Sequence, residues 1–318
     1  MKKSFLFALG MLLISSMAFG QSSSPRGGNP ADLVPFPNAH TGWFSFDLIR
    51  STVEDDEDDV EATTLNFVPS LTYAVNQKIA LTFGTKFVTG KEFSVAYGDD
   101  GGGDYEIGWG KAKLSGVSFK DLSLGLIWRV LDGTRDNHNN LNLSFNISPA
   151  IGKSEIKTDA ANNIKVKHLP NKNVLQINAA YSKDIGAAAV GLKFGLAYNG
   201  AQKIKFKIPM GEATDKNKAT LDFNIGTNVQ YRGIDKVALT AGLDYHRYGK
   251  LKLKDAEYVY QKAYGQFGLS LGANIQLAKN VYAAANYQHQ FETSLKSRGG
   301  KYAELSEDLL GIGATIKF

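Results

Sequence analysis

The end of the chain alternates strictly between two kinds of position. One parity is apolar up to the last residue, and the other is mostly small or polar: Leu310, Ile312, Ala314, Ile316 and Phe318 against Leu309, Gly311, Gly313, Thr315 and Lys317. A period of two is that of a β-strand, whose successive side chains point to opposite faces. Because the apolar face continues to the chain's final residue, the pattern predicts a strand with one face against lipid.

The same period recurs in eleven earlier stretches. Each places mostly Leu, Ile, Val, Phe or Tyr on one face and mostly Ser, Thr, Asn, Gln or Gly on the other: 43–50, 64–73, 79–87, 122–130, 141–151, 175–181, 190–198, 221–231, 237–245, 267–277 and 281–291. With the last stretch they predict twelve strands.

The lengths of the connections indicate how these strands are arranged. Short predicted turns alternate with longer loops, the turns at 75–78, 131–140, 183–187, 232–236 and 278–280 and the loops at 51–62, 89–120, 152–172, 199–218, 249–263 and 294–306. Outer-membrane barrels alternate short periplasmic turns with long outer loops in this way. We therefore predict an all-β fold over residues 43–318, a transmembrane antiparallel up-and-down β-barrel.

Aromatic residues on the apolar face support the same architecture. They lie near predicted strand ends, where a membrane barrel has its two aromatic girdles: Tyr73, Trp128, Tyr181, Tyr198, Tyr231 and Tyr245. A soluble β-sandwich would instead have polar outward faces.

The stretch 89–120 leaves the strand number open between twelve and fourteen. Its brief alternations form either a hairpin standing above the membrane or two further strands of the barrel wall. Lys111 and Lys113 share a face with Ile107 and Trp109, which argues against contact of that face with lipid. We keep twelve.

The N-terminal 42 residues have a different character. Lys2 and Lys3, an apolar run and small residues before Gln21 predict a signal peptide over 1–20, cleaved on export. Residues 21–42 are rich in Ser, Gly, Asn and Pro. We expect a disordered periplasmic lead there, with a short peg folded into the lumen as the alternative.

The amino-acid composition excludes several kinds of site and partner. The chain has no Cys, which excludes disulfides and thiolate metal sites. Loss of Lys2 and Lys3 lowers the formal net charge from +5 to +3, too mild to indicate nucleic acid. Acidic clusters in the first two outer loops do not have the spacing of an EF-hand, so we predict no metal and no cofactor.

The polar face of the predicted strands would line the lumen. Its charged and titratable members are Asp47, Lys86, Arg129, Lys193, Asp222, Asp244 and His246. Two alternating basic runs follow strands at their outer ends. If the strands continue in register, the runs place two lysine ladders side by side in the outer vestibule: Lys203, Lys205 and Lys207, with Lys250, Lys252 and Lys254. A cleft of one sign concentrates ions of the other. The alternative is that these lysines are solvated or bind lipopolysaccharide phosphates.

The sequence offers few groups of residues that could form an enzyme active site. His246 shares the inward face with Asp244, and His289 lies outward with Tyr287, but a hydrolase would need a serine nucleophile beside such a histidine. We find no convincing one and predict that the protein is not an enzyme.

Two resemblances bear on function. The stretches DLSLGLIWRVLDG (121–133), LNLSFNISPAIGKS (141–154) and AAYSKDIGAAAVGLKFGLAYNG (179–200) resemble outer-membrane transporters of the phenol-degradation MetA-pathway family, among the barrels similar to hydrocarbon and fatty-acid porins. That resemblance implies a twelve-strand transport barrel and hydrophobic or aromatic solutes. The final strand ending on Phe318 resembles the C-terminal signal by which Gram-negative bacteria recognise such barrels for assembly.

The sequence therefore predicts a channel of the bacterial outer membrane for passive passage of small solutes. The resemblance favours hydrophobic solutes, and the lysine ladders favour anionic ones. The alternative is a surface barrel without transport, whose outer loops bind lipopolysaccharide, host or a partner protein. The expected partners are the bilayer and its lipopolysaccharide, the outer-membrane assembly machinery and a small solute, but no nucleic acid.

Overall fold

The computed structural model describes residues 33–55, 60–98, 107–114, 118–132, 138–151, 155–158, 164–166, 172–208, 211–252, 259–261, 263–297 and 300–318. The predicted signal peptide and residues 21–32 lie outside this part of the chain. Within it, no helix is long and apolar enough to cross a bilayer.

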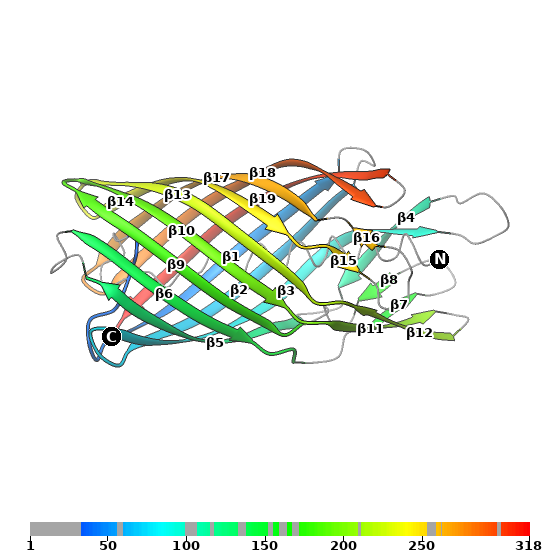
Figure 1. Cartoon of the computed structure of the whole chain (residues 1–318), viewed down its shortest axis with the longest axis horizontal. Coiled ribbons are helices and arrows are strands. Elements are labelled where there is room, and N and C mark those ends of the chain that lie inside the picture. The colour runs from blue at the N-terminus through cyan, green and yellow to red at the C-terminus, as the bar shows by residue number, and fades with distance from the viewer. Residues whose placement is uncertain are drawn as a thin grey trace.

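Twelve of the described strands form one closed antiparallel barrel, as predicted. They lie obliquely to its long axis (Figure 1). In order around the wall they are β1 (Gly42–Asp55), β2 (Val60–Ala74), β3 (Ile79–Gly98), β5 (Ser118–Leu131), β6 (Asn139–Ser148), β9 (Val174–Ile185), β10 (Ala188–Asn199), β13 (Thr220–Ile234), β14 (Val237–Tyr248), β17 (Tyr264–Ala278), β18 (Val281–Ser297) and β19 (Gly300–Lys317).

The first and last strands close the barrel. β1 pairs with β19 over thirteen positions, from Trp43 opposite Lys317 to Asp55 opposite Leu305. Gly42 and Phe318 exchange backbone hydrogen bonds of 3.0 Å at the end of this seam. The wall therefore has no free edge along it, which removes the unpaired backbone groups that a membrane cannot solvate.

Tight turns join the strands at the end of the barrel that holds Phe318, which we call the short-turn end (left in Figure 1). At the first, Asn76 Oδ1 accepts hydrogen bonds of 2.8 Å from the amides of Lys78 and Ile79. Gly186 and Lys236, in the turns before β10 and β14, have left-handed φ angles of 61° and 59°.

The opposite end, which we call the long-loop end, carries the other strands: β4 (Ile107–Leu114), β7 (Glu155–Thr158), β8 (Ile164–Val166), β11 (Gln202–Ile208), β12 (Gly211–Asn217), β15 (Leu251–Lys252) and β16 (Val259–Gln261) (Figure 1). β4 pairs with the outer part of β3, while the inner part of β3 pairs with β5. The stretch 89–120 thus holds a hairpin above the barrel, and the fourteen-strand alternative is wrong.

Several predicted outer loops are shorter than expected. β18 and β19 extend to residues 297 and 300, into the predicted loop 294–306, and β1 and β2 likewise extend into 51–62. These extensions lie beyond the apolar belt. Their outward side chains do not face lipid and need not be apolar, although the hydrogen bonds between the strands continue.

The outward face of the barrel is apolar. Its exposed side chains include Leu192 (55%), Leu243 (57%) and Leu310 (54%). Tyr73, Trp128 and Tyr231 are exposed towards the short-turn end and Tyr198 towards the other. An apolar band between aromatic girdles is the surface of a transmembrane barrel.

Candidate functional site: the barrel lumen

The inward face of the wall is built from carboxamide and hydroxyl groups lying over glycines. A polar side chain of a neighbouring strand covers each of four inward glycines: Gly125 under Asn146, Gly195 under Asn224, Gly242 under Asn228 and Gly272 under Thr240. A Cβ at any of these glycines would collide with the covering group. The glycines therefore let polar side chains lie flat on the wall, away from the barrel axis.

Water reaches the middle of the lumen. Asn286 also lies over Gly272, so it faces inward, yet its side chain is exposed. Lys193 faces inward beside Asp244 and is 39% exposed. Inward side chains that are exposed to this degree require a solvated interior.

A chain of polar groups crosses five strands at this level. Lys193 of β10, Gly226 of β13, Asp244 of β14 and Gly268 of β17 are successive cross-strand partners. Lys193 Nζ passes over Gly226 to lie 3.8 Å from Asp244 Oδ1. Gln288 of β18 reaches back past Gly268 and donates 3.0 Å to Asp244 Oδ2.

Asp244 is thus surrounded by donors. His246 Nε2 lies 3.4 Å from its Oδ2, and the Asp244 side chain is only 3% exposed. The Lys193 side chain is more exposed than its partners, at 39% against 3% for Asp244 and 11% for His246.

A second, half-buried acid lies nearer the long-loop end. Asp222 accepts hydrogen bonds from Asn199 Nδ2 and, at 2.7 Å, from the amide of Gly249. Its neighbours hold it against the wall, so its carboxylate is partly neutralised by donors.

The segment before β1 fills the short-turn end of the lumen, and we call residues 33–41 the N-terminal plug. Phe36 is 1% exposed and packs against three inward residues, Ala74, Ala80 and Ile127. The described residues 33–41 therefore lie inside the barrel, whereas the part of the expected lead or peg over residues 21–32 lies outside the described residues.

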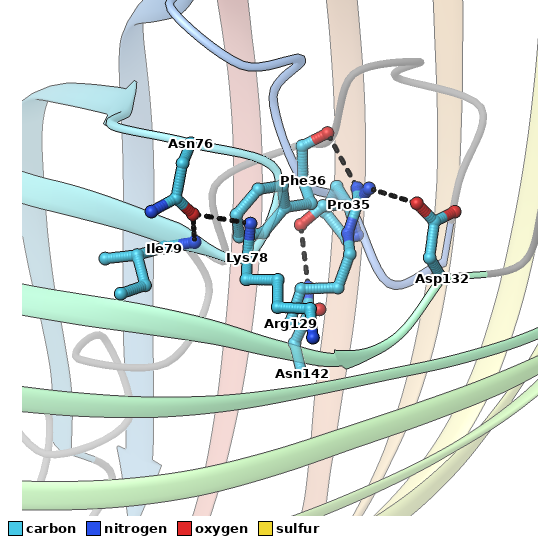
Figure 2. Close-up of polar contacts among 8 residues, drawn as sticks. All are labelled: Pro35, Phe36, Asn76, Lys78, Ile79, Arg129, Asp132 and Asn142. Atoms are coloured by element: carbon cyan, nitrogen blue, oxygen red, sulfur yellow. Dashed lines mark hydrogen bonds and ion pairs between the residues drawn. The ribbon is translucent and has the colours of Figure 1, made fainter.

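Arg129 and Asn142 hold the plug in place (Figure 2). The Arg129 guanidinium lies 4.1 Å from the centre of the Phe36 ring and donates 3.1 Å to the Phe36 carbonyl. It also pairs with Asp132 at 3.3 Å. Asn142 Nδ2 donates 3.0 Å to the Pro35 carbonyl. Both residues bind plug backbone, so the plug does not depend on apolar packing alone.

Buried side chains gather at the long-loop end of the lumen. Glu307 is 3% exposed, and its Oε1 accepts a 2.7 Å hydrogen bond from Ser51. Lys86, at 6% exposure, lies close enough to interact with this carboxylate. Gln290 and Tyr248 are buried beside it at 1% and 5%.

The structure places the predicted lumen residues of the barrel wall on the inward face: Asp47, Lys86, Arg129, Lys193, Asp222, Asp244 and His246. It does not gather them into one site. Arg129 belongs to the plug, Lys193, Asp244 and His246 form one group, and Lys86 lies near Glu307.

The two lysine runs lie beyond the barrel. Lys203, Lys205 and Lys207 belong to β11, which pairs with β12 and β7, and Lys252 belongs to β15, which pairs with β16. The described pairings therefore do not place the two runs side by side, because β13 separates the strands that lead to them. Lys250 is exposed, and Lys254 lies outside the described residues.

Three inward features were missed from the sequence: Phe36, Glu307 with Gln290, and the ion pair between Arg232 and Asp184. In that pair Nη2 and Oδ1 are 2.7 Å apart. Both partners fall in stretches that we predicted as turns. Their inward parity, continued from Gln230 and Ser182, was the signal that could have identified them.

His289 forms a cluster on the outward face. Asp308 Oδ1 lies 2.9 Å from His289 Nδ1 and accepts a 2.7 Å hydrogen bond from the Tyr287 hydroxyl. The described contacts of this histidine include no serine hydroxyl. Among described residues there is also no group of three acidic or histidine side chains that could hold a metal ion.

Comparison with known proteins supports the fold. No protein-family model and no curated protein matches the chain. Among solved structures, the COG4313 outer membrane channel from Pseudomonas putida F1 is similar, with a TM-score of 0.60, 14% identity, and 88% of this chain and 96% of that one covered. The translocator domain of the autotransporter NalP from Neisseria meningitidis gives a TM-score of 0.52 at 12% identity over the full length of both chains.

At these identities the likeness shows the fold, which is that of outer-membrane β-barrels. The twelve-strand barrel implied by the resemblance in residues 121–200 is confirmed as a fold. One of these two proteins is a channel and the other is the translocator domain of an autotransporter, so the shared fold does not determine the function.

Proposed function

We propose that this protein is a passive channel for small solutes in the outer membrane of a Gram-negative bacterium. The observation that supports it most is the solvated polar lumen, with inward Asn286 and Lys193 exposed to water inside an apolar outer surface. A barrel that served only as a membrane anchor would have no need of such an interior.

Buried side chains lie at both ends of the lumen. The N-terminal plug occupies the short-turn end, and Tyr248, Gln290 and Glu307 are buried at the other. Passage therefore requires movement of the plug or permits only small solutes around it. Both cases predict a low conductance in the resting protein.

The charges of the lumen favour neither sign strongly. Basic and acidic groups occur together, in the pairs Arg129 with Asp132, Arg232 with Asp184 and Lys193 with Asp244. The hydrophobic solutes implied by the family resemblance would meet mainly carboxamides in the middle of the barrel. An anionic preference would have to come from the lysine runs at the mouth.

We also propose that the chain is exported by a cleaved signal peptide and assembled through recognition of its C-terminal strand. Its outward polar rim, with Arg50 exposed, suits contact with lipopolysaccharide.

The test is solute flux with the mature protein in liposomes and ion current in planar bilayers. We expect small unitary currents and uptake of small solutes, both larger in a Phe36→Ala variant. Absence of current and uptake in both proteins, once insertion is verified, would overturn the channel and favour the surface-binding alternative.

A further inference from the structure

A group of buried polar atoms without partners lies at the long-loop end of the lumen. They are Gln290 Oε1 and Nε2, Glu307 Oε2 and the Tyr248 hydroxyl; within the described part of the chain none of them has a partner in good hydrogen-bond geometry, although the Tyr248 hydroxyl and the Gln290 amide lie close enough to interact with each other. Unpartnered polar atoms at this depth are few in native proteins, because each has lost its hydrogen bonds to water. The Glu307 oxygen and the remaining capacity of the Gln290 amide are therefore open to a partner from outside the chain.

The atoms converge from three strands. Gln290 of β18 and Glu307 of β19 are direct cross-strand partners on the inward face. Tyr248 of β14 reaches the same place, with Gln290 and Glu307 as neighbours of its hydroxyl. The group is thus one site, and it adjoins the Lys193 and Asp244 pair, because Gln290 and Asp244 are both cross-strand partners of Gly268.

The walls of the site are fixed by contacts of their own. The Tyr248 ring stacks on Tyr264 with centroids 4.7 Å apart. Ser51 donates to the other carboxylate oxygen of Glu307. Gln266 Nε2 donates 3.2 Å to the Phe291 carbonyl beside Gln290. The unpartnered atoms are therefore held in position in the absence of a ligand, which lowers the cost of binding one.

The chemistry of the site selects among ligands. Gln290 offers one donor and one acceptor, Glu307 an acceptor and Tyr248 either. A hydrocarbon would leave all of them unpaired, and an anion would meet the Glu307 carboxylate. Lys86 near that carboxylate offsets its charge and disfavours a cation.

The remaining wall is apolar. Val53, the cross-strand partner of Glu307, and Leu305 on the same face of β19 are 4% and 3% exposed. Apolar surface with a few fixed polar groups is typical of small-molecule sites. A neutral ligand that carries several hydroxyls matches each of these features.

We propose that Tyr248, Gln290 and Glu307 form a binding site for a neutral polyhydroxylated solute of the polyol or monosaccharide class. The site deepens the proposed channel function by naming the solute class, and it rests on that function only for its role in permeation. Binding itself can be measured without transport.

The test measures the binding of D-glucose and of xylitol to the purified full chain in detergent, by titration with saturation-transfer NMR as the readout. Tyr248→Phe removes one hydroxyl and keeps the ring stack, and Gln290→Leu removes both amide atoms at similar size. We expect binding to weaken about fivefold in the first and about tenfold or more in the second, since each loses hydrogen bonds to the ligand. Gln230→Leu is the matched control, because Gln230 is an equally buried inward glutamine at the short-turn end, and it should bind as the unaltered protein does.

Saturable binding that is weakened by both site variants and kept by the control would support the site. Absence of binding by both sugars, equal binding by all variants, or a preference for acetate or toluene at this place would overturn it. Heat-modifiable migration in electrophoresis shows that each variant is folded. Glucose binding without ion current would overturn the channel function but keep the binding site. Ion current without glucose binding would overturn the binding site but keep the channel function.

Discussion

Lys193 reaches across the backbone of Gly226 to Asp244, so that a cation of β10 and an anion of β14 meet 3.8 Å apart over the intervening strand. Asp244 has two further neighbours in Gln288 and His246, whereas the lysine is open to water. The two charges therefore contribute unequally to what a passing ion meets.

Neutralising Lys193 and neutralising Asp244 should shift the ion selectivity of the channel in opposite directions. Two unit charges 4 Å apart interact by about 1 kcal/mol in water, or about fivefold in local ion occupancy. We expect Lys193→Gln to shift the reversal potential in a KCl gradient towards cation preference and Asp244→Asn towards anion preference. Lys279→Gln, in an exposed turn, is the control. Shifts of the same sign in both lumen variants would contradict this arrangement.

Removal of the Phe36 ring should open the short-turn end. The ring is buried against Ala74, Ala80 and Ile127 and covered by Arg129, so Phe36→Ala loosens the plug. We expect a larger unitary conductance and a loss of roughly 3 kcal/mol in the unfolding free energy, the lower end for a buried phenylalanine. Phe36→Leu, which keeps most of the volume, should conduct nearly as the unaltered protein does. Equal conductance of all three would show that the plug does not limit the path.

A side chain at Gly42 should disturb closure of the barrel. A Cβ there would lie 2.5 Å from the Phe318 ring and 2.8 Å from the Thr72 carbonyl oxygen. We expect Gly42→Val and deletion of Phe318 each to lower the folded fraction in outer membranes, measured by heat-modifiable migration, and to leave the unitary conductance of the inserted molecules unchanged. Normal assembly of the Phe318 deletion would contradict its role as an assembly signal.

A charge on the lipid face should destabilise the barrel according to depth. Leu192 lies about midway along the outward face of β10, and Leu277 lies beside the turn after β17. We expect Leu192→Lys to cost about 2–4 kcal/mol in the free energy of unfolding from vesicles and Leu277→Lys about 0–1 kcal/mol. Equal losses of unfolding free energy in the two variants would mean that Leu192 and Leu277 do not lie at the depths in the membrane that we assign to them.

The alternation of apolar and polar residues along the strands could be predicted because every second side chain faces lipid and has to be apolar. Along β14, for example, Leu239 and Leu243 must face hydrocarbon, while Asp244 must face inward, and this alternation is present in the sequence alone. The number of strands and the positions of the short turns follow from the same constraint.

The contents of the lumen could not be predicted in the same way. Phe36 is buried by Arg129, which lies 93 positions away in the chain, and no local pattern records such a contact. Beyond the apolar belt, β18 and β19 lose the strict alternation of apolar and polar residues, so Glu307 looked like the end of a loop. The lysine runs belong to strands beyond the barrel, β11 and β15, whose pairing with β7, β12 and β16 involves loop segments that local parity does not describe.

The seam between β1 and β19 sets an order of events in the cell. The strand that the ribosome makes first among the twelve pairs with the one that it makes last, and thirteen cross-strand positions depend on both. Closure therefore has to wait for the whole chain, and β1 has an unsatisfied edge for the entire time of synthesis and export.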